Sequence, residues 1–386
     1  MLRPPNTISM LQICMILITA VGIMDHVIII PVMLQVAGRD SWVGTLLAGV
    51  VLLIWVCMIY WILKQTGKQN LFAWIRQRLG KAVGWTLSAF ILLELFLMAA
   101  VTHTDMIHWS KISYLPNTPL LVISGCFALL CFFAAYSGIR TIAIANGLLL
   151  PGVILLGIFV ASSNFPHKDY SLLLPVLHRG FDPVLKGIFY ACSGFSGIVM
   201  LLLLQHRLHS NARIRLWPLL VTAIILVDLT VGPLTGAISE FGPLESARMR
   251  FPAYEEWRLI TFGHYIEHVD FFVVYQWLVG ALIRVSVTLM LIPELLEIPE
   301  GKRRLWVLIG LFGLLIVFPL MPFSDIRFFA FLKNIYLPYV VMFWTLVTIV
   351  LFAAAFIKPK RGKAADAQGN QVEGLDHGQE KGRTTR

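Results

Sequence analysis

Two short stretches place polar or charged residues beside glycine within otherwise apolar sequence. They are Gly22, Ile23, Met24, Asp25 and His26, and then Ser193, Gly194, Phe195, Ser196 and Gly197. An interrupted helix frees backbone groups, so that its amino end can meet a carboxylate and its free carbonyls can meet an ammonium group or a cation. This pattern favours binding of a small charged solute. Close helix packing through small residues is the alternative explanation.

Four charged residues lie inside apolar runs, namely Asp25, Glu94, Asp228 and Arg284. A charge at mid-helix costs about 2.5–3.5 kcal/mol on insertion scales, so such residues usually face a cavity or a partner. Asp25 and His26 are the strongest site candidates, although His26 is equally compatible with a packed interior. Glu94 is a candidate for a ligand or ion contact, with a structural hydrogen bond as the alternative. Arg284 is either a counter-charge or a side chain that reaches the surface, and the role of Asp228 stays open.

The composition indicates an integral membrane protein. Of the 386 residues, 58% are apolar and 13% are charged, and the mean hydropathy is +0.78, whereas soluble domains carry about 25% charged residues. Only helices or closed barrels satisfy their backbone groups in lipid, and runs of about 20 apolar residues are helical in length. We therefore expect an all-α fold with about ten transmembrane helices. The expected spans are Ile8–Ala37, Ser41–Leu63, Val83–His108, Thr118–Tyr136, Thr141–Ser163, Leu185–Gln205, Leu216–Ile238, Phe271–Ile292, Leu305–Met321 and Ile335–Ile357.

Lysine and arginine are about twice as abundant on the side of both termini as on the other side. The positive-inside rule then predicts that both termini are cytoplasmic. Because these residues follow the membrane face, the net charge of +10 does not indicate a nucleic-acid partner. The transmembrane domain is expected to cover residues 1–357, and the polar residues 358–386 to form a disordered cytoplasmic tail.

Two loops are expected to hold additional helices. Residues 69–81 have the pattern of an amphipathic helix at the inner surface, with Leu71, Phe72, Trp74, Ile75 and Leu79 in the headgroup boundary. The segment 239–270 is too apolar for a disordered linker and is expected to form short helices on the outer side.

No pattern for an enzyme, a cofactor or a metal site outweighs these features. Residues 264–268 match the HxxEH motif of some zinc peptidases, but they lie in a loop that enters a span. No phosphate-binding loop or nucleophile elbow occurs, and the five cysteines form no CxxC pair. We expect no catalytic residue, no cofactor and no metal.

The two glycine-containing stretches occupy corresponding spans, the first and the sixth. The halves, about 8–163 and 185–357, would have opposite orientations in the membrane. Matched interruptions in inverted halves are the best sequence indication of a transporter-like site. We therefore predict a five-plus-five inverted repeat with broken helices 1 and 6.

Several short motifs, in order along the chain, resemble those of the GerAB-type spore germination permeases. They are residues 37–42 (AGRDSW), 115–119 (LPNTP), the prolines and glycines of 174–187, and the aromatic and charged residues of 251–270. This family belongs to the amino acid–polyamine–organocation superfamily with the LeuT-type fold. It commonly has a small or hydroxyl residue after the first-span glycine, where this chain has Ile23 to His26.

The resemblance implies a non-enzymatic membrane subunit of a germinant receptor in the inner membrane of the spore. Its partners would be an A subunit and a lipoprotein C subunit, and its ligand a small nutrient, typically an amino acid. Two alternatives stay open. One is a proton-coupled amino-acid transporter, and the other is an assembly subunit whose pocket binds nothing.

Overall fold

Long helices dominate the computed structural model, which describes residues 6–261, 268–321 and 324–357. Within these ranges, ten helical stretches are long and apolar enough to cross a membrane. They are Met10–Ile28, Ile30–Thr66, Lys81–Ser113, Leu120–Ser137, Ile139–His167, Asp182–Arg207, Leu216–Ser246, Phe272–Leu295, Lys302–Leu320 and Asp325–Ala354. The all-α, ten-span prediction is confirmed, whereas the five-plus-five inverted repeat stays a prediction.

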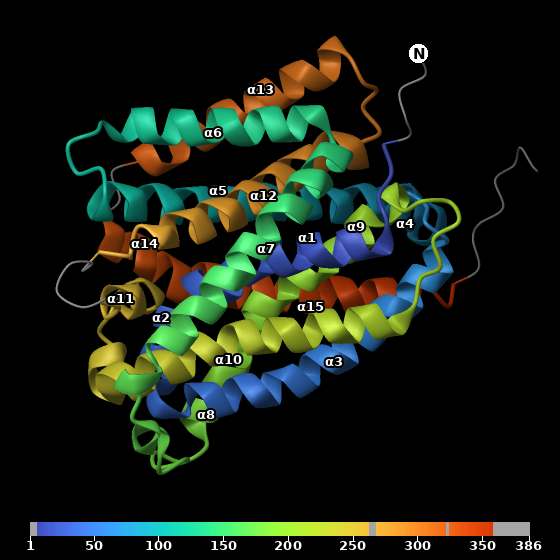
Figure 1. The fold of residues 1–386 in the computed structure, drawn as a ribbon. Helices are drawn as coiled ribbons and strands as arrows, with labels where there is room; N and C mark the ends of the chain where they lie inside the picture. The colour runs from blue at the N-terminus through green and yellow to red at the C-terminus, as the bar shows by residue number, and fades with distance from the viewer. Residues whose placement is uncertain (1–5, 262–267, 322–323, 358–386) are drawn as a thin grey trace, which may run out of the picture.

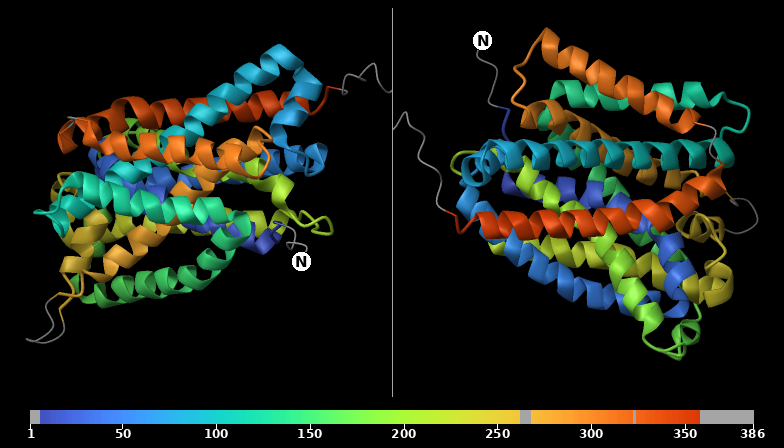
Figure 2. Two further views of the ribbon diagram at one scale, coloured as in Figure 1. Left: turned by 90° about the horizontal axis from the view of Figure 1, so that it is seen from above. Right: turned by 180° about the vertical axis from the view of Figure 1, so that it is seen from behind.

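The helices lie side by side in one bundle (Figure 1). Helix α12 (Phe272–Leu295) runs through its centre and packs against α1 (Met10–Ile23), α5 (Lys81–Ser113), α6 (Leu120–Ser137) and α7 (Ile139–Ser163). Helices α6 and α13 (Lys302–Val317) form one edge, and α3 (Ser41–Thr66) lies toward the other (Figures 1 and 2). Helix α12 is buried along most of its length, as expected for a helix surrounded by protein, and its buried residues include the charged Arg284 and Glu294.

The first crossing changes helix type near its middle. Helix α1 starts at a capping box formed by Ser9 and Gln12. A π-helical turn, η1 (Met24–Ile28), and then α2 (Ile30–Ala37) follow. Gly38, with a φ of +56°, separates α2 from α3, so we count α2 with the first crossing although its helical stretch runs on into the second. The interruption therefore begins two residues after Gly22. A π turn inside an α-helix is rare and often marks a functional site.

The sixth crossing is interrupted by a 3₁₀ turn, which is narrower than an α-helical turn, whereas the π turn of the first crossing is wider. Helix α8 (Asp182–Phe195) passes into a 3₁₀ turn, η5 (Ser196–Val199), which is followed by α9 (Met200–Leu204) and a second 3₁₀ turn, η6 (Gln205–Arg207). The residues at this junction keep right-handed helical φ and ψ angles. The interruption expected at Ser196 therefore exists as a change of helix type.

The tenth crossing contains an interruption that the sequence analysis missed. It begins with α14 (Asp325–Phe331), ten residues before the expected start at Ile335. A π turn, η8 (Leu332–Tyr336), then leads into α15 (Leu337–Ala354). Within the described residues, the first, sixth and tenth crossings thus each contain a non-α turn between two α-helices.

Two further helices lie in the loops. The expected short outer helix is α11 (Pro252–Arg258), which follows α10 (Leu216–Ser246). The expected amphipathic helix is α4 (Leu71–Leu79), capped by the Asn70 side chain. Its apolar residues Leu71, Phe72, Trp74 and Ile75 are buried in the protein, so the prediction that these four lie in the headgroup boundary is wrong. Leu79 is half-buried.

The bundle has two ends, which we call the terminal face and the loop face. The terminal face holds both ends of the described chain, because Arg207 Nη1 lies 3.4 Å from the Asn6 carbonyl and Arg78 Nη1 of α4 lies 2.9 Å from the Ala355 carbonyl. The loop face holds α2, α11 and α14 (Figure 1). The predicted tail, residues 358–386, lies outside the described residues.

Candidate functional site

The interruptions of the first and sixth crossings touch each other. Asp25 of η1 lies against Gly194, the penultimate residue of α8, and any Cβ at position 194 would overlap the Asp25 Oδ1 atom. One turn further along, a Cβ at Gly197 would lie 3.0 Å from Val21 Cγ2. Glycine is required because a carboxylate and a helix backbone occupy the same narrow space. The two stretches therefore lie in contact, and their role in ligand binding stays a prediction.

Asp25 is part of a buried charged cluster, which we define as Asp25, Glu94, Arg284 and Tyr336. All four residues are at most 2% exposed. They come from η1, α5, α12 and η8, and Arg284 interacts electrostatically with the other three. The Tyr336 hydroxyl lies 3.5 Å from Glu94 Oε1, and Arg284 Nη1 donates to the Ala20 carbonyl at 2.6 Å.

The carboxylates of this cluster have few hydrogen-bond partners within the described chain. Neither Asp25 oxygen has one, and Glu94 Oε2 and Arg284 Nε also lack one. Buried polar groups in proteins are nearly always paired, and unpaired ones are costly. Unpaired groups of opposite sign, placed together at a helix interruption, can hold an ammonium group and a polar or anionic group of a ligand.

The other residues predicted at the first interruption face elsewhere. His26 Nδ1 lies 3.1 Å from the Leu229 carbonyl of α10, and a Cβ at Gly22 would also meet Leu229, at 3.0 Å. Ile23 packs against Gly280 of α12. Among the first-span candidates, the charged cluster therefore includes only Asp25.

The hydroxyl groups of the second stretch are used within the fold. Ser193 Oγ donates to the Leu337 carbonyl at 2.9 Å and thereby joins α8 to the first residue of α15. Ser196 Oγ donates to the Ser193 carbonyl at 2.6 Å, and the Phe195 side chain is fully buried. At the candidate site, this stretch therefore provides a close backbone surface at its glycines, and its polar side chains are already hydrogen-bonded within the protein.

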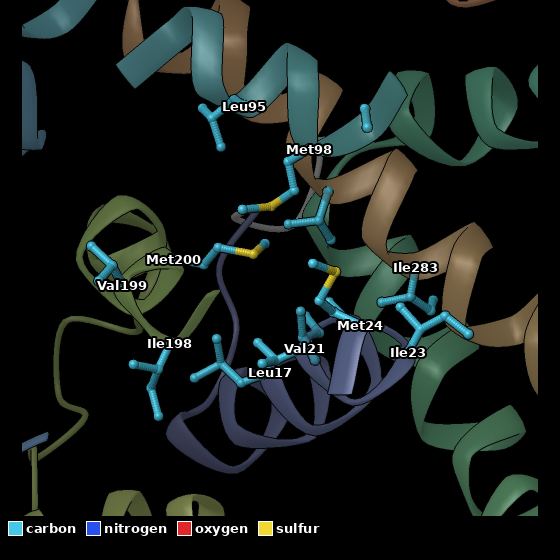
Figure 3. Packing of buried hydrophobic residues seen from close by; sticks show 14 of the residues in the cluster. Leu17, Val21, Ile23, Met24, Leu95, Met98, Ile198, Val199, Met200 and Ile283 are labelled. Atoms are coloured by element: carbon cyan, nitrogen blue, oxygen red, sulfur yellow. The ribbon is translucent and has the colours of Figure 1, made fainter. Parts of the chain in front are cut away.

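Apolar side chains fill the space beside the interruptions. Met24, Met98 and Met200 converge there from η1, α5 and α9, and Figure 3 shows them among other buried apolar residues. Methionine is flexible and adapts to irregular space. A small cavity begins nearby, lined by Ile23, Val27, Ile28, Thr102, Asp105, Met106, Trp277 and Ala281.

A clamp centred on Arg250 lies on the loop-face side of this cavity. Arg250 Nη2 binds Asp105 Oδ1 at 2.6 Å, and Arg250 Nε binds Asp325 Oδ2 at 3.1 Å. The guanidinium also lies over the rings of Phe251 and Phe329. Because Asp105 lines the cavity and also belongs to the clamp, the clamp borders the cavity.

A second ionic cluster, centred on Glu294, closes the terminal face. Its carboxylate binds Arg207 Nη2 of η6 at 2.8 Å and Arg304 Nη2 of α13 at 2.7 Å, and His206 Nε2 lies at 3.5 Å. The Glu294 side chain is 1% exposed. Strand-like pairing of Ile8 with Leu208 joins the same ends of the first and sixth crossings.

Sequence reasoning missed Tyr336, Arg250 and Glu294. Tyr336 lies in a span whose π turn contains Lys333 and Asn334, a polar signal without glycine. Arg250 lies in the loop before α11, and the residues it joins are far away in the chain. Of the HxxEH pattern, residues 264–267 lie outside the described residues. Elsewhere, within 6–261, 268–321 and 324–357, no group of three or more His, Cys, Asp or Glu side chains has metal-ligand geometry.

Comparison with known proteins identifies one protein family along most of the chain. The family described as "Spore germination protein" matches residues 7–326. Spore germination protein XB of Bacillus anthracis is 38% identical over 357 residues, which cover 92% of this chain and all of that protein. GerQB of Bacillus cereus is 26% identical over 71% of this chain and 75% of its own length. Spore germination protein KB of Bacillus subtilis (strain 168) is 25% identical over 66% of this chain and 69% of its own length. This multi-pass membrane protein therefore belongs to the spore germination protein family.

Proposed function

We propose that the chain is the membrane subunit of a spore germinant receptor and that it binds a small nutrient where the first and sixth crossings meet. It would lie in the inner membrane of the spore with both termini cytoplasmic, and it would act together with an A and a C subunit. Membership of the germination family supports the role. The contact of the unpaired Asp25 carboxylate with Gly194 is the observation that supports the site.

The packing around this contact suggests how binding would be sensed. A solute that reaches Asp25 must displace the methionine side chains beside it and separate η1 from α8. Ser193 joins α8 to α15, so the separation would reach the tenth crossing as well. A ligand shifts such an equilibrium only by its differential affinity for the two arrangements. The partner subunits would respond to the rearranged bundle.

Spores that carry Gly194→Ala test this proposal. The added methyl group must push Asp25 away, so we expect loss of most of the nutrient response, measured as the fall in optical density of a spore suspension. Gly232→Ala is the matched control, because a Cβ at Gly232 of α10 meets no atom within 4 Å. If spores with Gly194→Ala contain normal amounts of the protein and respond like the control, the site is elsewhere.

A proton-coupled solute carrier is the second candidate, and the buried carboxylates of Asp25 and Glu94 favour it, since carboxyl groups in a span can carry protons. Vesicles containing the chain without partners separate the two functions. Accumulation of a radiolabelled amino acid driven by a proton gradient would support the carrier. Binding without accumulation would support the receptor.

A further inference from the structure

A groove opens on the side of the bundle between α3, α8 and α15, and its volume is about 570 Å³. Buried residues form its floor, namely Trp55, Cys192, Val341 and Thr348. Exposed apolar residues form its rims, among them Val51, Leu185 and Ile349. All of its lining residues belong to membrane spans, so the groove faces the hydrocarbon of the bilayer.

The groove offers almost only apolar contacts. None of its twelve lining residues is charged. Trp55 Nε1 donates to Thr348 Oγ1 at 2.9 Å, and Thr348 Oγ1 in turn donates to the Trp344 carbonyl at 2.7 Å. The indole and hydroxyl groups of the floor are therefore already paired, and a polar occupant would lose its hydration without gaining partners there.

We propose that this groove is a binding site for an acyl chain of a membrane phospholipid. A transmembrane helix of a partner is the competing occupant, and size separates the two. On α8 the lining extends from Leu185 to Cys192, which is about 11 Å at the helical rise per residue. A helix is about 10–12 Å wide with its side chains, so a segment of that length fills about 900–1,200 Å³. The groove holds about 570 Å³, which suits a thinner and more flexible chain.

The composition of the lining also favours a lipid chain. Helices in membranes approach each other through small residues, above all glycine, alanine and serine. None of the twelve lining residues is of these three types. The glycines of α3 face the protein interior instead, because a Cβ at Gly44 would meet Gly187 and one at Gly49 would meet Val227.

The apolar rim continues from the groove to the loop face. Leu185 is 63% exposed, and Phe181, one turn earlier, is 71% exposed. The ion pair of Asp182 and Lys186 lies at the same end of α8. A phospholipid with its chain in the groove would place its headgroup beside this pair, which offers one charge of each sign.

The groove borders the joint between the sixth and tenth crossings. Cys192 of the floor precedes Ser193, whose hydroxyl donates to the Leu337 carbonyl, and Val341 lies one turn further along α15. A bound chain would contact α3, α8 and α15 together and hold them in this arrangement. The lipid site goes beyond the proposed function and does not depend on the nutrient that is bound.

Titration of the delipidated full chain in mild detergent, followed by native mass spectrometry, tests the site. The probe is dioleoylphosphatidylcholine, whose headgroup carries one charge of each sign. We expect one lipid to bind saturably. Val51→Trp and Thr345→Trp fill the groove from exposed positions and should weaken binding by about tenfold or more, because the displaced methylene groups lose their burial.

Leu346→Trp is the matched control for these two variants. Leu346 is exposed beside Thr345 on α15 but does not line the groove, so its variant should bind the lipid like the wild type. Equal affinities for the wild type and both filled variants would overturn the proposal. A folded wild-type chain without a saturable lipid would overturn it too.

Photocrosslinking in membranes of spores that carry Thr345→benzoylphenylalanine separates the two occupants in place. The expected product is the chain with the added mass of one phospholipid. A crosslink from this position to a transmembrane segment of another polypeptide would overturn the lipid site and assign the groove to a subunit interface.

Discussion

The ionic clusters at the two ends of the bundle have central residues of opposite charge. At the terminal face, one carboxylate, Glu294, is surrounded by Arg207, Arg304 and His206, and its side chain is 1% exposed. At the loop face, one guanidinium, Arg250, lies between two carboxylates and is 19% exposed. Ion pairs gain strength as water is excluded, and surface pairs contribute little. The comparison indicates that the loop face opens at lower cost than the terminal face.

Removing the carboxylate of Glu294 should have the largest effect. Glu294→Ala leaves two arginines without their buried partner, so we expect the free energy of unfolding to fall by about 3–5 kcal/mol. Thermal unfolding of the purified chain measures the change. Glu297→Ala is the control, since that carboxylate is 55% exposed and 3.8 Å from Arg76. Similar losses in both variants would contradict the idea that the terminal face is the more tightly closed.

Arg250→Ala should have a smaller but clear effect. It separates α5 from α14 and removes the contacts with two aromatic rings, and we expect a loss of about 1–3 kcal/mol because the site is partly hydrated. It should also make a cysteine introduced at Thr102, which lines the small cavity, react faster with a water-soluble thiol reagent. Arg258→Ala, in an exposed pair with Glu255, should change neither measurement. An unchanged labelling rate would mean that the clamp does not close the cavity.

The loop face should also respond to pH through Glu256. Burial and the neighbouring carboxylate of Glu240 raise the pKa of Glu256 well above its ordinary value of 4.5. The folded state therefore holds a proton that the unfolded state releases, and stability falls as pH rises from about 4.5 toward the folded pKa. Relative to Glu256→Gln, the wild type should lose thermal stability across this window. Glu255→Gln should follow the wild type at every pH, and parallel curves for all three proteins would refute the prediction.

The smallest effect is expected at the exposed pair of Asp182 and Lys186 on α8, whose side chains are 72% and 53% exposed. Asp182→Ala should change the free energy of unfolding by less than about 0.5 kcal/mol. The same thermal unfolding measurement tests it. A larger loss would show that loop-face ion pairs are more strongly coupled to the bundle than their exposure indicates.

Hydropathy was sufficient to predict the ten crossings, because a span must be apolar over a fixed length whatever its neighbours are. Glycine beside polar residues located the interruptions of the first and sixth crossings to within a few residues. The same signal failed at the tenth crossing. Its π turn contains no glycine, and Asp325, Arg327 and Lys333 lower the local hydropathy, so the expected start fell too late.

Contacts between distant segments were beyond sequence reasoning. Asp25 and Arg284 are far apart in the chain, and nothing in either segment indicates which acid faces which base. Likewise, the pattern of α4 revealed an apolar face, but burial of that face depended on the positions of α5 and α15. His26 is an example in which neighbours in the sequence are separated in space. Its position next to Asp25 suggested a shared role, but in the π turn His26 faces Leu229 whereas Asp25 faces Gly194.

The π turn at Met24–Ile28 affects how the first crossing tolerates a change in the number of its residues. Such a turn accommodates one more residue than an α-helical turn, and each residue advances a helix by about 100°. A relative that lacks one residue here could form a continuous α-helix, because the π turn takes up the extra residue locally and leaves the helical faces on either side nearly in register. The turn therefore lets the chain lose a single residue at this point while the side chains from Ile29 onward still face the sixth crossing.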